Sequence, residues 1–350
     1  MIRGAVSRRA GRAARAFADI YAGNGCIGVV REARNDWERR VVLTPRHVRE
    51  LVQRGFRIIV QPSSKRIFSD HDYVTAGATL SDDLSAAAVV LGVKQVPPAL
   101  LLRDKTYLFF SHTIKGQAEN MPLLDAVLEK NIRLIDFECI RAPGTNSRLV
   151  AFGRFAGMAG LVDILQGMGQ RLLLDGHSTP FLSCPLTHMH GSLRDARRSL
   201  FELGEELRTQ GLPLSVSPLV FAFTSTGNVS HGAQEMFRLL PHIMVDVADL
   251  PTLQARVRDG ELPSNVVFGT VVEAKHMVER RGGGPFSREE YRRWPQRYQP
   301  VFHRDVAPYV SCLVNCMYWD DRYPRLLTRA QAMDLATAAT SAARPENGTR

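Results

Sequence analysis

The sequence has 350 residues, enough for two domains of ordinary size, and its 45% hydrophobic residues can build a core for each, which excludes an intrinsically disordered chain. No apolar run approaches the ~18 residues that a membrane span needs, so we expect a soluble protein without a membrane partner. The formal charge is +10, but residues 1–25 hold five Arg and one Asp, which leaves a net charge of +6 for residues 26–350. The Lys and Arg residues of 26–350 are spread widely and accompany no aromatic-rich module, so we expect no nucleic-acid partner.

An acid-poor, arginine-rich segment opens the chain. Residues 1–25 contain only Asp19 as an acid and carry Arg3, Arg8, Arg9, Arg12 and Arg15 among small residues. A disordered basic tail has a similar composition, but the pattern is typical of mitochondrial import leaders and lacks the apolar run of a secretory signal. We therefore predict delivery to the mitochondrial matrix.

Cysteine and histidine patterns indicate neither disulfides nor a metal. The five cysteines are odd in number and scattered. Cys312 and Cys316 lie close together, as do His188 and His190, but neither pair has the spacing of a zinc ribbon or finger. We expect buried thiols, surface imidazoles and no metal.

Strands and helices alternate through residues 26–155, the predicted N-terminal catalytic domain. Short apolar runs predict strands at 26–30, 57–60, 88–93, 107–110 and 133–135. A helix begins after Thr44, since Thr at the N-cap and Pro at the first helical position are typical of a helix start. Another spans 117–130, with Met121, Leu124, Val127 and Leu128 on its apolar side. This alternation predicts a parallel sheet covered on both faces.

A second succession of strands and helices occupies residues 156–335, the predicted dinucleotide-binding domain. We expect helices at 156–174, 193–208 and 232–239, and strands at 219–223 and 243–247. The first helix contains Gly157, Gly160, Gly167 and Gly169, which would allow close approach of a neighbouring element. Residues 280–300 read as an exposed loop and 336–350 as a disordered tail. The predicted fold class is α/β, with two Rossmann-like domains, parallel sheets and an inter-domain cleft.

A turn of small residues follows the strand at 219–223. Such a turn lets the backbone approach a pyrophosphate, which the free N–H groups of the next helix can bind. The acid that holds the adenosine ribose is expected ~20 residues on, and Asp246 lies 19 after Gly227. A tight turn without a ligand, with Asp246 as a surface acid, fits the same pattern. The predicted cofactor residues are Ser225, Thr226, Gly227, Asn228, Val229, Ser230 and Asp246.

Two titratable side chains follow predicted strands of the first domain, Lys94 and His112. Ligands of parallel α/β sheets bind at the carboxyl ends of strands, so one site can receive both side chains. Lys and His can move protons in carbonyl or imine chemistry. Position alone leaves open a surface lysine and a helix-capping histidine.

Several motifs resemble, in order, the lysine-ketoglutarate reductase part of the bifunctional α-aminoadipic semialdehyde synthases. They are WERR (37–40) before LTP (43–45), LGVK (91–94), FFSHTIK (109–115), RLID (133–136), VAFG (150–153), TGNVS (226–230) and YPRLLT (323–328). The resemblance implies the fold of saccharopine dehydrogenase and alanine dehydrogenase, with the active site between two Rossmann-like domains.

The resemblance also implies a reaction of lysine degradation. L-Lysine condenses through its ε-amine with 2-oxoglutarate, and the imine is reduced to saccharopine with a nicotinamide hydride. Lys94 and His112 match the acid/base pair, Arg40 matches the arginine that binds a substrate carboxylate, and Glu138 falls at an acidic cleft position. From the residues alone, Arg40 can equally form an ion pair with Glu38. The resemblance favours NADPH, whereas an acid such as Asp246 generally favours NAD, so NAD stays open.

Two departures from the family pattern leave alternatives. Ser225 stands where the family usually has glycine, and the sequence ends soon after Thr328, where relatives continue. The alternatives to an active reductase are therefore a truncated form that is inactive alone and a regulatory isoform that pairs with a full-length partner. Within enzymes, the alternative is an NAD-dependent, lysine-forming saccharopine dehydrogenase. A homo-oligomer is compatible with the sequence.

Overall fold

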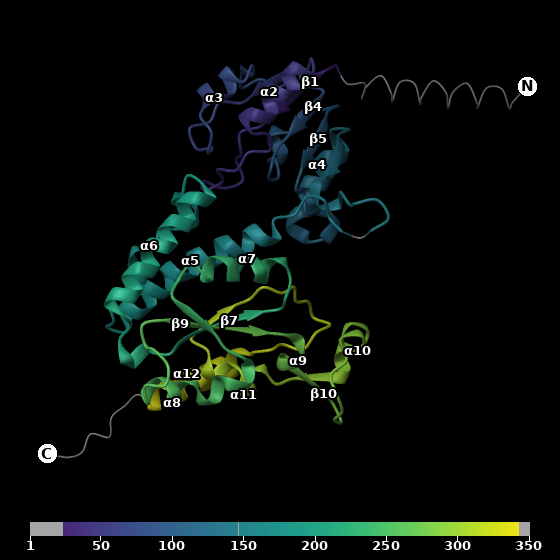
Figure 1. Ribbon diagram of the computed structural model, residues 1–350. Helices are drawn as coiled ribbons and strands as arrows, with labels where there is room; N and C mark the ends of the chain where they lie inside the picture. Colours follow the sequence, from purple (N-terminus) through teal and green to yellow (C-terminus); the bar gives the residue numbers. More distant parts are fainter. Residues whose placement is uncertain (1–23, 146, 343–350) are drawn as a thin grey trace, which may run out of the picture. The chain divides into compact units, whose positions relative to one another are not determined.

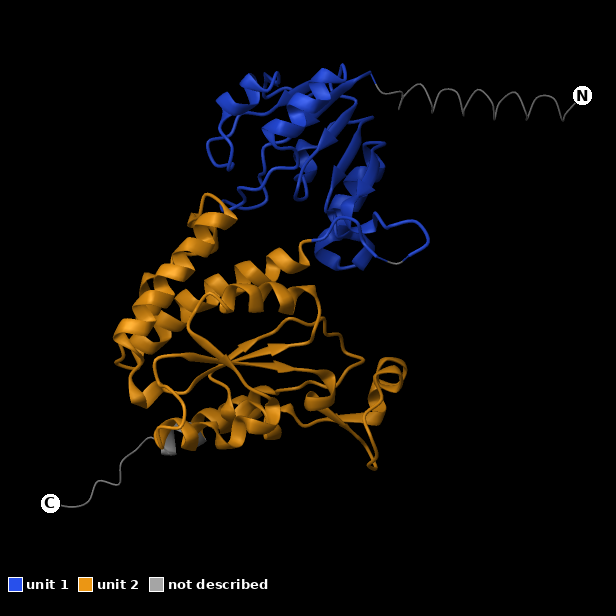
Figure 2. Ribbon diagram, in the orientation of Figure 1, with its two compact units in different colours: residues 1–151 blue, residues 152–350 orange. Residues whose placement is uncertain are grey.

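The computed structural model describes residues 24–145 and 147–342, which form two compact units, Met1–Ala151 and Phe152–Arg350 (Figures 1 and 2). The division between Ala151 and Phe152 lies close to the boundary expected at 155/156. The predicted leader, apart from residues 24 and 25, lies outside the described residues, and so does the end of the predicted tail, 343–350. None of the described helices is both long and apolar enough to span a membrane.

A six-stranded parallel sheet forms the centre of the first unit. Its order is β3-β2-β1-β4-β5-β6, the order of a doubly wound fold, so the switch point lies between β1 and β4. All five predicted strands are present within a few residues of their expected bounds; β3 was not expected. The strands are β1 (Cys26–Val29), β2 (Arg57–Val60), β3 (Thr79–Leu80), β4 (Val89–Leu91), β5 (Thr106–Phe109) and β6 (Arg133–Asp136).

Helices cover both faces of this sheet. Ile58 and Val60 of β2 belong to the apolar cluster that includes Val48 and Tyr73, whereas the intervening Ile59 belongs to the cluster that includes Leu123. This alternation explains the continuous apolar sequence of β2, because a central strand buries both of its faces. The helices are α2 (Pro45–Gln53), α3 (Asp70–Thr75) and α4 (Met121–Glu129), with short 3-10 turns η1 (Pro98–Leu100), η2 (Thr113–Lys115), η3 (Ala118–Asn120) and η4 (Phe137–Cys139).

Two helices of this unit were expected, and one differs in its buried face. Thr44 caps α2 as expected: its hydroxyl accepts from His47 N at 3.4 Å, and its own N–H donates to His47 Nδ1. Helix α4 begins only at Met121, and its buried residues are Leu123, Ala126 and Val127. Leu128, expected on the apolar side, is 71% exposed. The buried stripe therefore shares Val127 with the expected one but is otherwise formed by Leu123 and Ala126.

The second unit is built on a four-stranded parallel sheet with the order β12-β7-β9-β8. Figure 1 labels its two inner strands, β7 and β9. Its strands are β7 (Leu219–Thr224), β8 (His242–Met244), β9 (Val267–Val272) and β12 (Cys312–Val314), and β10 (Val278–Arg280) pairs antiparallel with β11 (Tyr298–Pro300). The helices are α5 (Gly153–Leu174), α6 (Leu193–Gln210), α7 (Asn228–Phe237), α8 (Leu250–Arg258), α9 (Ala274–Met277), α10 (Arg288–Arg293), α11 (Phe302–Asp305) and α12 (Arg329–Ala342). The 3-10 turns are η5 (Pro180–Ser183), η6 (Thr187–Met189), η7 (Leu214–Val216), η8 (Val247–Asp249), η9 (Pro295–Arg297) and η10 (Ala307–Tyr309).

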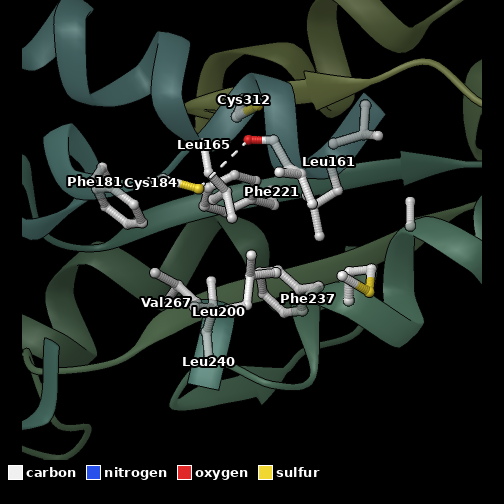
Figure 3. Packing of buried hydrophobic residues seen from close by; sticks show 14 of the residues in the cluster. Leu161, Leu165, Phe181, Cys184, Leu200, Phe221, Phe237, Leu240, Val267 and Cys312 are labelled. Carbon is white, nitrogen blue, oxygen red and sulfur yellow. Dashed lines mark hydrogen bonds between the residues drawn. The ribbon is translucent and has the colours of Figure 1, made fainter. Parts of the chain in front are cut away.

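Strand β7 lies at the centre of the core, and all six of its residues are buried. Phe221 and Phe223 pack with Leu161 and Leu200 of α5 and α6 and with Phe237 of α7, the cluster shown in Figure 3. The alternate residues of β7 pack in a second cluster with side chains of α8 and α11. The strand is therefore buried on both faces, which accounts for its apolar sequence.

Close contact between α5 and α7 depends on two glycines. A Cβ at Gly157 would lie 2.8 Å from Ala233 N and still closer to Val229 O, and a Cβ at Gly232 would meet Arg154 O. The expected role in close approach is confirmed for Gly157, and for Gly169, whose Cβ would meet the backbone of residues 181 and 182. Gly160 and Gly167 have no heavy atom near the Cβ position.

Two expectations for this unit were wrong. Residues 280–300 are not simply an exposed loop, because they contain α10 and β11 and bury Tyr291 and Tyr298. These two rings pack together with the ring of Phe286 and form an apolar cluster. The neighbouring glycines in the sequence had suggested a loop instead. Residues 336–342, expected to be disordered, continue α12. That segment is rich in Ala and lacks Gly and Pro, and Thr328 and Gln331 cap its start reciprocally.

Candidate functional site

Three predicted site residues follow neighbouring strands at the carboxyl edge of the first sheet. Lys94 lies just past β4, His112 just past β5 and Glu138 just past β6. These strands are adjacent, and neighbouring strands lie ~4.8 Å apart. The sheet therefore brings these three positions to one edge, as the strand-end reasoning predicted for Lys94 and His112.

His112 is held by Glu138. Its backbone has φ +58°, in the left-handed region, and its Nδ1 lies 3.0 Å from Glu138 Oε2. Burial raises the pKa of Glu138, but the His112 hydrogen bond and the Lys115 charge outweigh it, so the net pKa is lowered. An ionised carboxylate only accepts hydrogen bonds, so we assign the proton to Nδ1, which leaves Nε2 as the basic atom of the neutral ring.

Glu138 is the centre of an ion-pair cluster. Besides His112, its carboxylate pairs with Lys115 Nζ at 3.3 Å and Arg148 Nη1 at 2.9 Å. The sequence suggested Glu138 as a substrate-binding acid and did not identify Lys115 or Arg148. With three basic partners, the carboxylate is arranged to orient His112.

The carboxylate of Glu32 organises the backbone around Lys94. It accepts hydrogen bonds from Val93 N at 2.6 Å and Lys94 N at 3.0 Å, which joins the ends of β1 and β4 at the switch point. Burial raises the pKa of Glu32 in spite of these two bonds. Lys94 is half-buried beside a cavity of about 380 Å³ that Gln95 and Tyr107 also line. Sequence reasoning missed Glu32, whose position two residues after the predicted strand at 26–30 was the available signal.

Arg40 forms the ion pair with Glu38 that the sequence left open. Its Nε lies 2.8 Å from Glu38 Oε1 and its Nη2 lies 2.7 Å from Oε2, a bidentate arrangement. Burial raises the pKa of Glu38, but Arg40 outweighs it, so the net pKa is lowered. Glu38 is buried, whereas the Arg40 side chain is 46% exposed. Arg40 and Glu38 line a small cavity together with Glu32, which places the pair near the backbone of Lys94 at the same edge of the sheet.

The turn between β7 and α7 leaves its backbone open. Ser225 has φ +71° and donates through its N–H to Val272 O at 2.9 Å. A Cβ at Gly227 would meet only Ser225 Oγ, at 3.7 Å, and the first turn of α7 offers N–H groups that no helix carbonyl accepts. The turn therefore fits a pyrophosphate that approaches Gly227 and Asn228.

Two of the predicted turn residues point elsewhere through their side chains. Ser230 is buried, and its hydroxyl accepts from Gln234 Nε2 at 3.0 Å within α7. Val229 lies against α5, since a Cβ on Gly153 would sit 3.8 Å from Val229 Cγ2. Only their backbone remains for a ligand, whereas Ser225 and Thr226 line a cavity.

Asp246 does not follow the strand beside β7. It lies just past β8, and β9 separates β8 from β7. The acid directly after the neighbouring strand is Glu273, which follows β9 and lines the same cavity as Ser225 and Thr226. Sequence reasoning took the next strand in the chain as the neighbour and overlooked 267–272, although the β-branched residues there were a usable signal.

At the switch point of the second sheet, one hydroxyl joins β7 to β12. Thr224 Oγ1 donates to Asn315 Oδ1 at 3.1 Å and accepts from Cys316 N at 2.8 Å.

Among residues 24–145 and 147–342, no group of three or more His, Cys, Asp or Glu side chains could hold a metal ion.

Known proteins are similar to most of this chain. Residues 28–159 match the family model "Alanine dehydrogenase/PNT, N-terminal domain". The chain is 46% identical over 328 residues to the alpha-aminoadipic semialdehyde synthase of Arabidopsis thaliana, covering 89% of this chain and 30% of that protein. It is 43% identical over 318 residues to "Alpha-aminoadipic semialdehyde synthase, mitochondrial" of Mus musculus, covering 91% and 34%.

A more limited similarity extends to "Saccharopine dehydrogenase [NAD(+), L-lysine-forming]" of Yarrowia lipolytica. The identity is 32% over 128 residues, which covers 35% of this chain and 34% of that protein. The similarity to the synthases is both closer and far more extensive. The chain is therefore related over most of its length to the alpha-aminoadipic semialdehyde synthases, of which it spans 30–34% of the length, and residues 28–159 are of the alanine dehydrogenase/PNT N-terminal type.

Proposed function

We propose that this chain is a lysine-ketoglutarate reductase of lysine degradation, which forms saccharopine from L-lysine and 2-oxoglutarate with NADPH in the mitochondrial matrix. The observation that carries the proposal is the His112–Glu138 pair at the carboxyl edge of the sheet, next to the strand end that bears Lys94. The similarity to the synthases over nearly nine tenths of the chain supports the choice of substrates. The mitochondrial names of the mammalian relatives and the arginine-rich first 25 residues support the location.

The unit-1 residues have the chemistry that imine formation requires. His112 Nε2 can take a proton from the ε-ammonium of lysine, which produces the nucleophilic amine. After the amine adds to the keto carbon, the Lys94 ammonium can protonate the leaving hydroxyl of the carbinolamine, so that water departs. Glu138 orients the imidazole and stabilises its protonated form, as the third group of a catalytic triad does. Both substrates carry carboxylates, for which the half-exposed guanidinium of Arg40 is suited.

Unit 2 has features that fit a nicotinamide dinucleotide. The open backbone at Gly227 and Asn228, the start of α7 and the cavity beside Ser225 and Thr226 would hold it. When bound, the cofactor supplies the hydride that reduces the imine. Asp246, proposed from spacing as the ribose acid, lies past β8 and outside the residues that line this cavity.

The test is saccharopine production by the full chain. Purified protein is mixed with L-lysine, 2-oxoglutarate and NADPH; cofactor oxidation is followed by absorbance, and saccharopine is identified by mass spectrometry. We expect His112→Gln to lower kcat by about 10²- to 10⁴-fold, the usual contribution of an acid/base group. His71→Gln, an exposed histidine on α3, is the matched control and should be unaffected.

The outcomes separate the alternatives. Nucleotide binding without turnover, with activity restored only by a full-length synthase, would favour a regulatory or truncated isoform over a reductase. A preference for NAD⁺ and for conversion of saccharopine to lysine would favour the lysine-forming dehydrogenase. Equal activity of His112→Gln and wild type would refute the proposed acid/base role.

A further inference from the structure

A charged cavity lies over the carboxyl ends of the strands in unit 2. Its volume is about 240 Å³, and it borders the turn that is proposed to bind pyrophosphate. Residues from four segments line it, among them Ser225 and Thr226 from the turn, Glu273 after β9, Arg288 and Arg292 from α10, and Tyr323 after β12. The cavity is therefore part of the proposed cofactor site, but the part of the dinucleotide that it receives has not yet been assigned.

Helix α10 presents two arginines to this cavity. Arg288 and Arg292 are four residues apart, so they lie on the same face of the helix. Between them, Tyr291 is buried and packs against the rings of Tyr298 and Tyr323, with centroid distances of 5.2 and 5.3 Å. This aromatic anchor fixes which side of the short helix faces the cavity. The next residue, Arg293, does not line the cavity and lies over the Trp294 ring instead.

The charges that line this cavity, together with Lys275 beside it, favour an anion. Glu273 Oε2 lies 3.2 Å from Arg288 Nη2, and its Oε1 lies 3.4 Å from Lys275 Nζ, so two cations already offset its negative charge. Arg292 makes no hydrogen bond or ion pair with the residues that the structure describes. The four side chains together leave an excess of positive charge, which a phosphate dianion would balance.

The order of the strands relates the cavity to one end of the dinucleotide. In Rossmann-type sheets the pyrophosphate binds at the first turn, and the adenosine ribose binds at the end of the neighbouring strand of that half. Here the neighbouring strand is β9, and Glu273 is the first residue after it. A free acid at this position repels a 2′-phosphate, whereas an arginine nearby accommodates it. Glu273 is paired with an arginine, and a second arginine lies on the same helical face.

We infer that this cavity binds the adenosine ribose of the cofactor, with Arg288 and Arg292 contacting a 2′-phosphate and with Glu273, not Asp246, as the acid nearest the ribose. The inference rests on the proposed use of a nicotinamide dinucleotide and identifies the residues that select its phosphorylated form. It predicts that the chain discriminates NADP⁺ from NAD⁺ through α10.

The test is calorimetric titration of the full chain with NADP⁺, NAD⁺, 2′,5′-ADP and inorganic phosphate, without substrates. We expect wild type to bind NADP⁺ more tightly than NAD⁺ and to bind 2′,5′-ADP. Arg292→Ala should weaken NADP⁺ binding by about ten- to hundredfold, the usual loss for a hydrogen bond to a charged group, and should change NAD⁺ binding less than about twofold. Arg292→Lys should recover part of the loss. Arg293→Ala, with the same loss of charge on the neighbouring residue, should change neither affinity.

Several results would overturn the inference. In the wild type, these are equal affinity for NADP⁺ and NAD⁺, no binding of either dinucleotide, or binding of inorganic phosphate as tight as that of 2′,5′-ADP. Among the variants, they are NADP⁺ binding that does not depend on Arg292, or a dinucleotide preference that changes in Asp246→Asn and not in the α10 variants. Saccharopine formation is measured separately. Arg292-dependent NADP⁺ binding without saccharopine formation would refute the proposed reaction and leave the inference standing, and saccharopine formation with an indifferent Arg292 would do the reverse.

Discussion

Replacement of Gly157 by alanine would press α5 and α7 apart at the turn that is proposed to bind the cofactor. The added Cβ would lie 2.8 Å from Ala233 N and closer still to Val229 O, and both neighbours are backbone atoms that no rotamer change can move. The helices would have to separate by about 1.5 Å to bring the contact with Val229 O to a normal distance. Buried residues on both sides, such as Met158 and Met236, would lose packing.

The expected magnitude follows from two opposing terms. Overpacking of a core costs roughly 1–3 kcal/mol, and a rigid backbone neighbour favours the upper part of that range. Alanine recovers about 1 kcal/mol through its higher helix propensity. We therefore expect a net loss of about 2 kcal/mol in the free energy of unfolding. For a unit of this size, each kcal/mol lowers Tm by about 2–4 °C, so the loss corresponds to about 4–8 °C.

The same helix provides the control. Gly160 is exposed and has no heavy atom within 4 Å of its Cβ position, so Gly160→Ala gains propensity without a clash and should raise Tm. Thermal and denaturant unfolding of the full chain, followed by circular dichroism, compares the three proteins. A Gly157→Ala protein that unfolds at the wild-type midpoint would refute the close contact between the two helices.

Three further predictions concern a carboxylate, a hydroxyl and a thiol. Because the pKa of Glu138 is lowered in the folded state, its ionised carboxylate stabilises the fold above the ordinary pKa of 4.5, and this stabilisation is lost as the pH falls through the lowered pKa. The difference in the free energy of unfolding between wild type and Glu138→Gln should therefore shrink below about pH 4.5 in denaturant titrations. Thr224→Val leaves the N–H of Cys316 without an acceptor and should cost about 1–3 kcal/mol in the same titrations, whereas an unchanged midpoint would argue against that bond. Cys139 is the exposed member of the five cysteines, so a thiol reagent should label one site in the native protein, and Cys139→Ser should abolish this labelling.

Features set by a short stretch of sequence were predicted well. The strand at 57–60 follows from a short run of apolar residues, and the start of the helix follows from the capping pair Thr44–Pro45. Both signals act within a few residues. Lys94 and His112 were placed at the sheet edge for the same reason, because each is joined by the chain directly to a strand end. Such positions need no knowledge of which strands are neighbours.

Features set by tertiary contact were predicted less well. The buried face of α4 depends on which stripe meets the sheet, and its pattern alone allowed Leu128 to be placed inside. The ion pairs of Glu138 with Lys115 and Arg148 join segments whose approach depends on the loop that follows β6. Residues 280–300 form ordered structure because the rings of Phe286, Tyr291 and Tyr298 pack together, whereas the adjacent glycines suggested a loop.

The position of the ribose acid illustrates the difference between these two kinds of inference. The rule that an acid lies ~20 residues beyond the turn assumes that the next strand in the chain is also the next strand in the sheet. In this unit β9 lies between β7 and β8, so spacing along the chain selects Asp246 while adjacency in the sheet selects Glu273. A ligand at the turn contacts whatever is adjacent in space, and the adjacent acid is already paired with Arg288. Selectivity between the two dinucleotides should therefore follow α10, a helix that spacing rules do not consider.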